Sequence, residues 1–548
     1  MSTPLTMQEL FIKNTLTFEN KFIDNAIIPV PIKDAKFGVL NLQAISSPVS
    51  ENHHDFVFMI DCSASMTDIC YDNKTKMQHI IHTLKNMIIY FKENPNIKNY
   101  LTVNAFDDKI YNILERTTIT NTNFNEVIQK IEEIIPRGST NIESALKNVK
   151  EIVSKIKDVC SGSIISNIFM TDGNATTGNC NYNALAQLVD RSITNYFIGF
   201  GIQHDSTMLN TISNGENSSY YFIDQLENAG YVYGEILHGI MYKLLKNVSF
   251  RVDNGLIYDF KNNMWVSSLV IGEIISEANK IFHICSNDSD ECLVTLTAQI
   301  ANDIQARDNS TCIEFIINND NKNDDVNDTN TFQKYIYRQR TLQHLFIVKD
   351  FLKRKSDGNI RKDSIFMNVN IDDIVEFKKE EININTNLRG FIVEMKNFML
   401  ENKLCEDYFM KNLCDDIYIC YRTFGTVYGD MYVSSRQRSQ GAQRCYTVTH
   451  TPEDIDSDLE YNECEEGLLK PRILTRQPTR SSIHMLSPPH MLSPPHMLSP
   501  PHMLSPPPLK HTMSKNSDAP YRTPTSTKIM REIIRKNDVY SDNYSMPV

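Results

Sequence analysis

The sequence predicts an α/β protein: a parallel sheet flanked by helices, then a small β-rich domain, a helical region and a disordered C-terminal tail. Three observations predict this class. Apolar strand-like runs alternate with helical segments over residues 52–228. Short apolar runs without helices between them follow over 229–317, and a proline-rich repeat lies near the C-terminus. Strands that alternate with helices favour a parallel sheet covered on both faces.

Residues 52–228 give the order of the elements in this sheet domain. The expected strands are Phe56–Ile60, Tyr100–Phe106, Ile164–Met170 and Thr194–Phe200. The expected helices are Lys74–Glu93, Asn123–Ile135, Ile142–Lys157 and Tyr182–Ser192, followed by a long closing helix at about Leu226–Leu245. In such open sheets ligands bind beyond the carboxyl ends of the strands.

The flanking segments differ from this domain in composition. Residues 1–51 contain short strands, which we expect to pack on the β-rich domain at 229–317. Asparagine and aspartate dominate residues 318–330, which predicts a flexible loop. Residues 331–450 carry apolar side chains at intervals of three and four, which predicts a helical accessory domain.

The last segment, residues 451–548, is predicted to be a disordered tail. The unit HMLSPP occurs four times in tandem at 484–507, and its proline pairs are incompatible with a helix or a sheet interior. The repeat is either a neutral linker or a multivalent docking or Ser-Pro phosphorylation segment that binds further proteins. A short basic helix, STKIMREIIRK, is expected close to the end and could fold on a partner.

Bulk composition excludes several classes of protein. A net charge of -12 and a pI near 5.7 argue against nucleic acid as a partner. The cysteines form no C-x-x-C pair, so a structural zinc site has little support. The chain has neither a signal-like N-terminus nor an apolar run long enough to span a membrane. We therefore expect a cytoplasmic protein with reduced cysteines.

The candidate site consists of small oxygen-bearing residues from three distant segments. The apolar run FVFMI ends in Asp61, with Ser63 and Ser65 directly after it. Thr140 lies in a Gly-Ser turn before a helix, and Asp172 ends the run IISNIFMT. We expect these five side chains to meet at one edge of the sheet, because each follows a strand or precedes a helix there.

Two carboxylates and three hydroxyls are hard oxygen donors, the set that Mg²⁺ or Mn²⁺ prefers. An open coordination position on the ion would attract a carboxylate from another molecule. Two alternatives stay open: a structural or scaffold protein whose metal only stabilises the domain, and a hydrolase that uses Ser63 or Ser65. The hydrolase needs a base such as His53 or His79, and no G-x-S-x-G elbow is present.

The stretches DFVFMIDCSASM, RGSTNIESAL and FMTDG resemble the metal-ion-dependent adhesion site (MIDAS) of von Willebrand factor type A (VWA) domains. Asp61, Ser63, Ser65, Thr140 and Asp172 match its five metal-coordinating positions. The resemblance covers residues 52–228. It implies a Rossmann-like sheet that binds one divalent ion and is not an enzyme. It also implies a protein partner that supplies a Glu or Asp to the metal.

A second resemblance concerns the segment beyond the sheet domain. YRQRTLQHLF and TFGTVYGDMYVSSRQRSQGAQRCYTV resemble the accessory segment of VWA proteins that carry a Hint module, an architecture found in large DNA viruses of amoebae. No Hint module is recognisable here, so self-splicing is not expected. If the source is viral, this resemblance places the protein in the host cytoplasm or the virion.

Overall fold

The computed structural model describes residues 16–23, 36–47, 53–69, 74–95, 97–201, 204–215, 217–223, 229–286, 292–301, 311–317, 326–357, 371–426, 429–444 and 521–541. The HMLSPP repeats and the acidic segment at 451–466 lie outside these ranges. None of the described helices is both long enough and apolar enough to cross a lipid bilayer.

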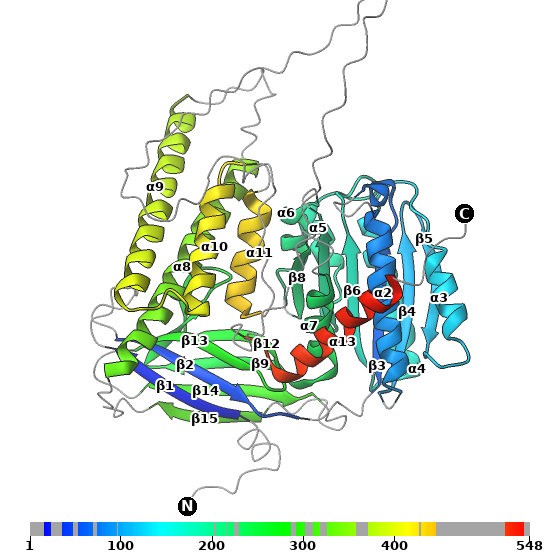
Figure 1. Cartoon of the computed structure of the whole chain (residues 1–548), viewed down its shortest axis with the longest axis horizontal. Coiled ribbons are helices and arrows are strands. Elements are labelled where there is room, and N and C mark those ends of the chain that lie inside the picture. The colour runs from blue at the N-terminus through cyan, green and yellow to red at the C-terminus, as the bar shows by residue number, and fades with distance from the viewer. Residues whose placement is uncertain are drawn as a thin grey trace, which may run out of the picture. The chain divides into compact units, whose positions relative to one another are not determined.

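A six-stranded sheet forms the centre of the domain that the sequence placed at 52–228 (Figure 1). The strands are β3 (His54–Asp61), β4 (Asn99–Phe106), β5 (Ile110–Thr117), β6 (Ile164–Thr171), β7 (Thr194–Phe200) and β8 (Ser218–Ile223), in the order β5-β4-β3-β6-β7-β8. All neighbouring pairs are parallel except β4 and β5. The prediction of a parallel sheet is therefore wrong at this edge, because the short turn at 107–109 allows only an antiparallel partner.

Helices cover both faces of this sheet, so the predicted fold class is confirmed. One face packs against α2 (Lys76–Glu93), α3 (Phe124–Glu132) and α7 (Ala229–Met241), and the other against α4 (Ile142–Val159), α5 (Tyr182–Leu188) and α6 (Ser206–Ile212). Successive side chains of β3 are buried on alternate faces, with Phe58 in one core and Met59 in the other. This burial explains the uninterrupted apolar run of β3.

The closing helix is shorter than the sequence predicted. The structure ends α7 at Met241, whereas the prediction continued to Leu245. Lys243 instead begins the strand β9 (Lys243–Asp253), in which buried and half-exposed side chains largely alternate. The apolar residues at 244 and 245 fit a helix or a strand, and pairing with neighbouring strands decides the outcome.

Two antiparallel sheets form the β-rich domain. One contains β1 (Leu16–Ile23), β2 (Lys36–Ala44), β13 (Asn279–Ser286), β10 (Gly255–Asp259) and β11 (Met264–Val266), and the other contains β12 (Ser268–Ile275), β9, β14 (Cys292–Ile300) and β15 (Thr311–Ile317). Side chains of both sheets share one core, for example Leu42, Ile284, Phe250 and Leu296. The N-terminal strand β2 pairs with β13, which joins the start of the chain to this domain.

Four helices follow: α8 (Val326–Asp357), α9 (Ile371–Glu401), α10 (Tyr408–Thr423) and α11 (Gly429–Ala442). Residues 326–330, expected in the flexible loop at 318–330, already belong to α8. The prediction of a loop is therefore wrong at these five residues, because Asn and Asp are favoured at helix starts as well as in loops.

Helix α11 is buried along nearly its whole length although it is largely polar. It reaches the sheet domain through Asp430, whose Oδ2 accepts a hydrogen bond of 2.6 Å from the Ser206 hydroxyl. It reaches the β-rich domain through Gln437, whose Nε2 donates to the carbonyl of Phe260 at 2.7 Å. These bonds satisfy polar groups that would otherwise be costly to bury.

The final helix confirms the helix expected at STKIMREIIRK and corrects the prediction of a disordered tail over the described residues 521–541. Helix α13 (Pro524–Ser541) packs on α7 and α2. Ile529 and Ile533 are nearly fully buried in the core that α2 and α7 share, and Met530 is 2% exposed. A Cβ on Gly234 of α7 would lie 2.5 Å from Cγ of Met530, so the two helices approach closely only because residue 234 is glycine.

Candidate metal centre

Asp61 is the last residue of β3, at the carboxyl end of the sheet. Its Oδ1 accepts a bond of 2.8 Å from the backbone N–H of Ser63, and its Oδ2 accepts one of 2.6 Å from the Thr171 hydroxyl. Burial raises the pKa of Asp61 to about 6, although these hydrogen bonds oppose the rise. A cation beside the carboxylate would restore its ordinary acidity.

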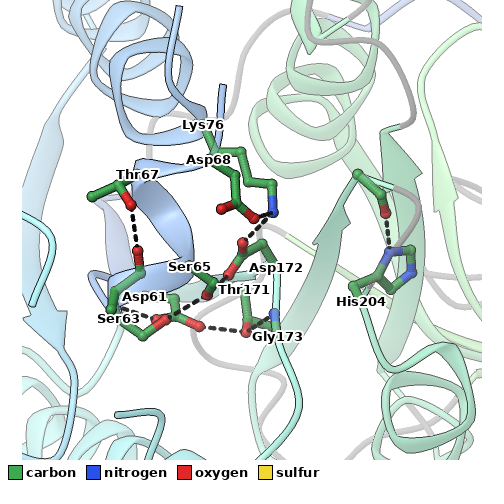
Figure 2. A network of polar contacts seen from close by, with 12 residues as sticks. Asp61, Ser63, Ser65, Thr67, Asp68, Lys76, Thr171, Asp172, Gly173 and His204 are labelled. Carbon is green, nitrogen blue, oxygen red and sulfur yellow. Dashed lines mark hydrogen bonds and ion pairs between the residues drawn. The ribbon is translucent and has the colours of Figure 1, made fainter. Parts of the chain in front are cut away.

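The two serines connect the end of β3 to the end of β6. The Oγ atoms of Ser63 and Ser65 lie 3.1 Å apart, and the Ser65 hydroxyl donates to Oδ1 of Asp172 at 2.8 Å (Figure 2). Ser65 lies in the short 3-10 helix η1 (Ala64–Thr67), which turns the chain sharply after β3. Residues more than one hundred positions apart therefore share one hydrogen-bonded group, as the sequence predicted for Ser63, Ser65 and Asp172.

Thr140 approaches the same place from a third segment. Its backbone N–H donates to Oγ1 of Thr176 at 2.8 Å, which fixes the loop that carries it. A Cβ placed on Gly173 would lie 3.6 Å from Oγ1 of Thr140 and 3.7 Å from Oγ of Ser65. The Thr140 and Ser65 hydroxyls therefore flank the backbone that follows Asp172.

Lys76, a residue that the sequence did not single out, also contacts this group. It is the first residue of α2, and its Nζ donates to Oδ2 of Asp172 at 2.6 Å and to Oδ2 of Asp68 at 2.9 Å (Figure 2). Burial alone would lower the pKa of Lys76, but the bonds to Asp172 and Asp68 raise it above its ordinary value. The side chain is therefore a charged ammonium.

The thiol of Cys62, next to Asp61, is a packed side chain. It is 1% exposed. Burial raises the pKa of this thiol to about 12, so it stays protonated at neutral pH. A protonated, buried thiol is a poor nucleophile.

The hydrolase alternative needs a base beside Ser63 or Ser65. Within the described residues, the hydrogen-bond partners of the Ser63 and Ser65 hydroxyls are each other and Asp172, and none is a histidine. His53 precedes β3, at the end of the strand opposite to Asp61, and eight residues of strand span roughly 25 Å. This distance excludes His53 as the general base of a hydrolase centred on Ser63.

The donor set fits a hard divalent cation better than a softer metal. Nowhere in the described part of the chain do three His, Cys, Asp or Glu side chains come together as a metal-binding group. The group at the carboxyl edge instead combines two carboxylates with hydroxyls. Oxygen donors of this kind, supplemented by water, match Mg²⁺ or Mn²⁺.

Comparison with known proteins identifies the sheet domain. The sequence model of the von Willebrand factor type A domain matches residues 55–234. No curated protein matches the chain. Residues 55–234 form a VWA domain, a type of domain that commonly mediates protein–protein interaction and often binds a divalent metal at a MIDAS. The matched region ends before most of the β-rich and helical segments, so the resemblance to Hint-associated proteins stays a prediction.

Similar solved structures include other VWA proteins. A von Willebrand factor type A protein from Catenulispora acidiphila shares 16% identity at a TM-score of 0.43, over 63% of this chain and 82% of that one. The ArnB paralog VWA2 from Sulfolobus acidocaldarius shares 13% identity at 0.44, over 78% and 98%. Proximal thread matrix protein 1 from the mussel byssus, with a zinc-occupied MIDAS motif, shares 20% at 0.27, over 33% and 46%.

Proposed function

We propose that the VWA domain binds Mg²⁺ or Mn²⁺ through Asp61, Ser63, Ser65, Thr140 and Asp172, and that the ion captures a Glu or Asp side chain of a protein partner. The observation that carries this proposal is the bonded group of Ser63, Ser65 and Asp172, assembled from two strand ends that are distant in sequence. The Thr140 hydroxyl beside Gly173 supplies a donor from a third segment.

The charge of the group supports a cation rather than an anion. Asp61 and Asp172 are both at most 1% exposed, and buried carboxylates are stable only with hydrogen bonds or a cation nearby. The metal would neutralise them and keep a position for one more oxygen ligand. A carboxylate is the side chain with the strongest attraction to that position.

The test compares two variants of one residue, since Thr140→Ala removes a hydroxyl that Thr140→Ser retains. Titration calorimetry with Mn²⁺ and with Mg²⁺ should give Thr140→Ser an affinity close to that of the natural chain. Thr140→Ala should bind at least about tenfold more weakly, the loss of one ligand costing about 1.4 kcal/mol or more. Equal affinity of the two variants contradicts the role of Thr140.

Partner capture tests the second half of the proposal. Proteins retained from a cell extract in Mg²⁺ should be released by EDTA and should not bind the Asp61→Ala variant. The scaffold alternative predicts a different result: metal removal lowers the melting temperature while the retained proteins stay the same. Retention that persists in EDTA therefore rejects metal-dependent capture.

A further inference from the structure

Lys76 places a positive charge inside the predicted metal centre. The Lys76 side chain is only 11% exposed, the Asp172 side chain is fully buried, and the two are joined by a bond of 2.6 Å. Asp68, at 50% exposure, forms the outer partner of the same ammonium at 2.9 Å. Figure 2 shows Lys76 between Asp68 and Asp172, on the side of Asp172 away from Asp61.

Local structure holds Lys76 in this position. Thr75 caps α2 through a capping box with Gln78, which fixes the first turn of the helix. The backbone N–H of Lys76 donates to the carbonyl of Asp68 at 3.1 Å. Cε of Lys76 lies 3.6 Å from where a Cβ on Gly201 would be, which places the lysine stem against the end of β7. The contact with Asp172 is therefore built into the fold of the helix terminus.

Both carboxylate oxygens of Asp172 are already in use. Oδ1 accepts from the Ser65 hydroxyl and Oδ2 accepts from the Lys76 ammonium. A divalent ion that coordinates Oδ2 of Asp172 competes with the ammonium for that oxygen, and one that coordinates Oδ1 binds beside the same ammonium. Either ion must approach a like charge at a distance of a few ångströms, where repulsion is strong in a partly buried site.

We propose that Lys76 is the resident counter-cation of this centre, and that a divalent metal binds by displacing its ammonium from Asp172. The inference rests on the proposed metal site and adds a residue that sets its affinity. In the metal-free protein Lys76 neutralises a buried carboxylate. In the metal-bound protein its ammonium keeps Asp68, which lies at the rim, as its partner.

Two properties follow from this competition. The centre binds divalent ions more weakly than the same donor set would without the lysine. It also discriminates against monovalent ions, because a single positive charge gains little by replacing an ammonium that is already bonded. Strong coordination by a divalent ion is required to offset the loss of the ion pair.

The test measures metal affinity after the charge is removed. Lys76→Met keeps the apolar stem and loses the ammonium; Lys85→Met, on the same helix but paired with Glu132, is the matched control. Calorimetric titration with Mn²⁺ should show the dissociation constant of Lys76→Met falling by about tenfold or more, because a like charge is gone. Lys85→Met should bind as the natural chain does.

Thermal unfolding gives a second readout. In EDTA, Lys76→Met should melt below the natural chain, since Asp172 is left buried without a cation. On addition of Mn²⁺ its melting temperature should rise by more than that of the natural chain. A merely structural lysine predicts the first effect without the second. Lys76→Gln, which keeps a hydrogen-bond donor, replaces Lys76→Met if the latter does not fold.

The outcomes separate this inference from the proposed function. Unchanged or weaker Mn²⁺ binding by Lys76→Met, while the natural chain binds, overturns the role of Lys76 and leaves the metal site standing. Binding by Lys76→Met alone rejects metal capture by the natural chain and supports the lysine as the competing cation. Failure of both proteins to bind Mn²⁺ rejects both proposals.

Discussion

Replacement of Ile533 by alanine should release α13 from the VWA domain. Ile533 is fully buried, Ile529 is 2% exposed in the same core, and Met530 is also 2% exposed. The first turn of the helix adds a bond of 2.9 Å from the Thr525 N–H to Glu277. Among the side chains of α13 that the structure describes, these three provide the buried apolar contact with the VWA domain.

The size of the effect follows from this burial. Three buried side chains of this kind contribute about 6 kcal/mol in total, and ordering of the helix offsets much of it. Ile533→Ala removes about 3 kcal/mol, through lost transfer free energy and the cavity left behind. That loss corresponds to about a hundredfold change in the docking equilibrium, which leaves α13 largely detached.

Amide hydrogen exchange measures this equilibrium directly. Peptides from residues 524–541 should exchange about a hundredfold faster in Ile533→Ala than in the natural chain, and peptides of α2 and α7 should lose protection where α13 covered them. Arg531→Ala, an exposed position on the same helix, is the control. Protection of 524–541 that matches the Arg531→Ala control would refute the docking argument.

Three further changes have defined expected results. Gly138→Ala should lower the melting temperature and weaken Mn²⁺ binding, because residue 138 has a φ of +68° and a Cβ there would lie 2.8 Å from an Asp108 oxygen. The control is Gly272→Ala, at a position with a positive φ but open space. It should cost only the backbone strain of about 1 kcal/mol and leave Mn²⁺ binding unchanged. Arg436→Met should lower the free energy of unfolding in urea by about 3–5 kcal/mol, since it leaves the buried Asp416 carboxylate without its cation. The double variant that also carries Asp416→Leu should recover most of this loss. His238→Phe should reduce the acid sensitivity of unfolding. Burial lowers the pKa of His238 to about 4, so the unfolded chain takes up the proton first as pH falls below 6.5. Between pH 7 and pH 5 the natural chain should therefore lose about 2 kcal/mol of stability that the variant keeps. An equal pH dependence in both proteins would show that His238 does not titrate in this way.

The sequence was most informative where side chains are buried on both sides of an element. Strands β3, β4, β6 and β7 were predicted because each contains a run of apolar residues, and nearly every residue in them is buried. Strand β5 was missed, since its pattern of half-exposed side chains has neither an apolar run nor strict alternation. Strand β8 and helix α6 were missed because each is short.

The candidate site was predictable only in part for a related reason. Asp61, Ser63, Ser65 and Asp172 follow strand ends, and strand ends of a parallel sheet meet at one edge. Lys76 lies at a helix start, fifteen positions after Asp61, and nothing in the sequence indicates that its stem turns toward Asp172 rather than solvent. Long side chains reach their partners through rotamers, which sequence spacing does not encode.

With α13 docked, the chain is buried in the folded unit on both sides of residues 445–520. Arg444 is 9% exposed and donates to the carbonyl of Tyr220 at 2.5 Å, and Thr523 is 6% exposed at the start of α13. The chain is therefore held in one folded unit both before residue 445 and after residue 520. Release of α13 by Ile533→Ala would free the second of these attachments and leave the first, at Arg444, in place.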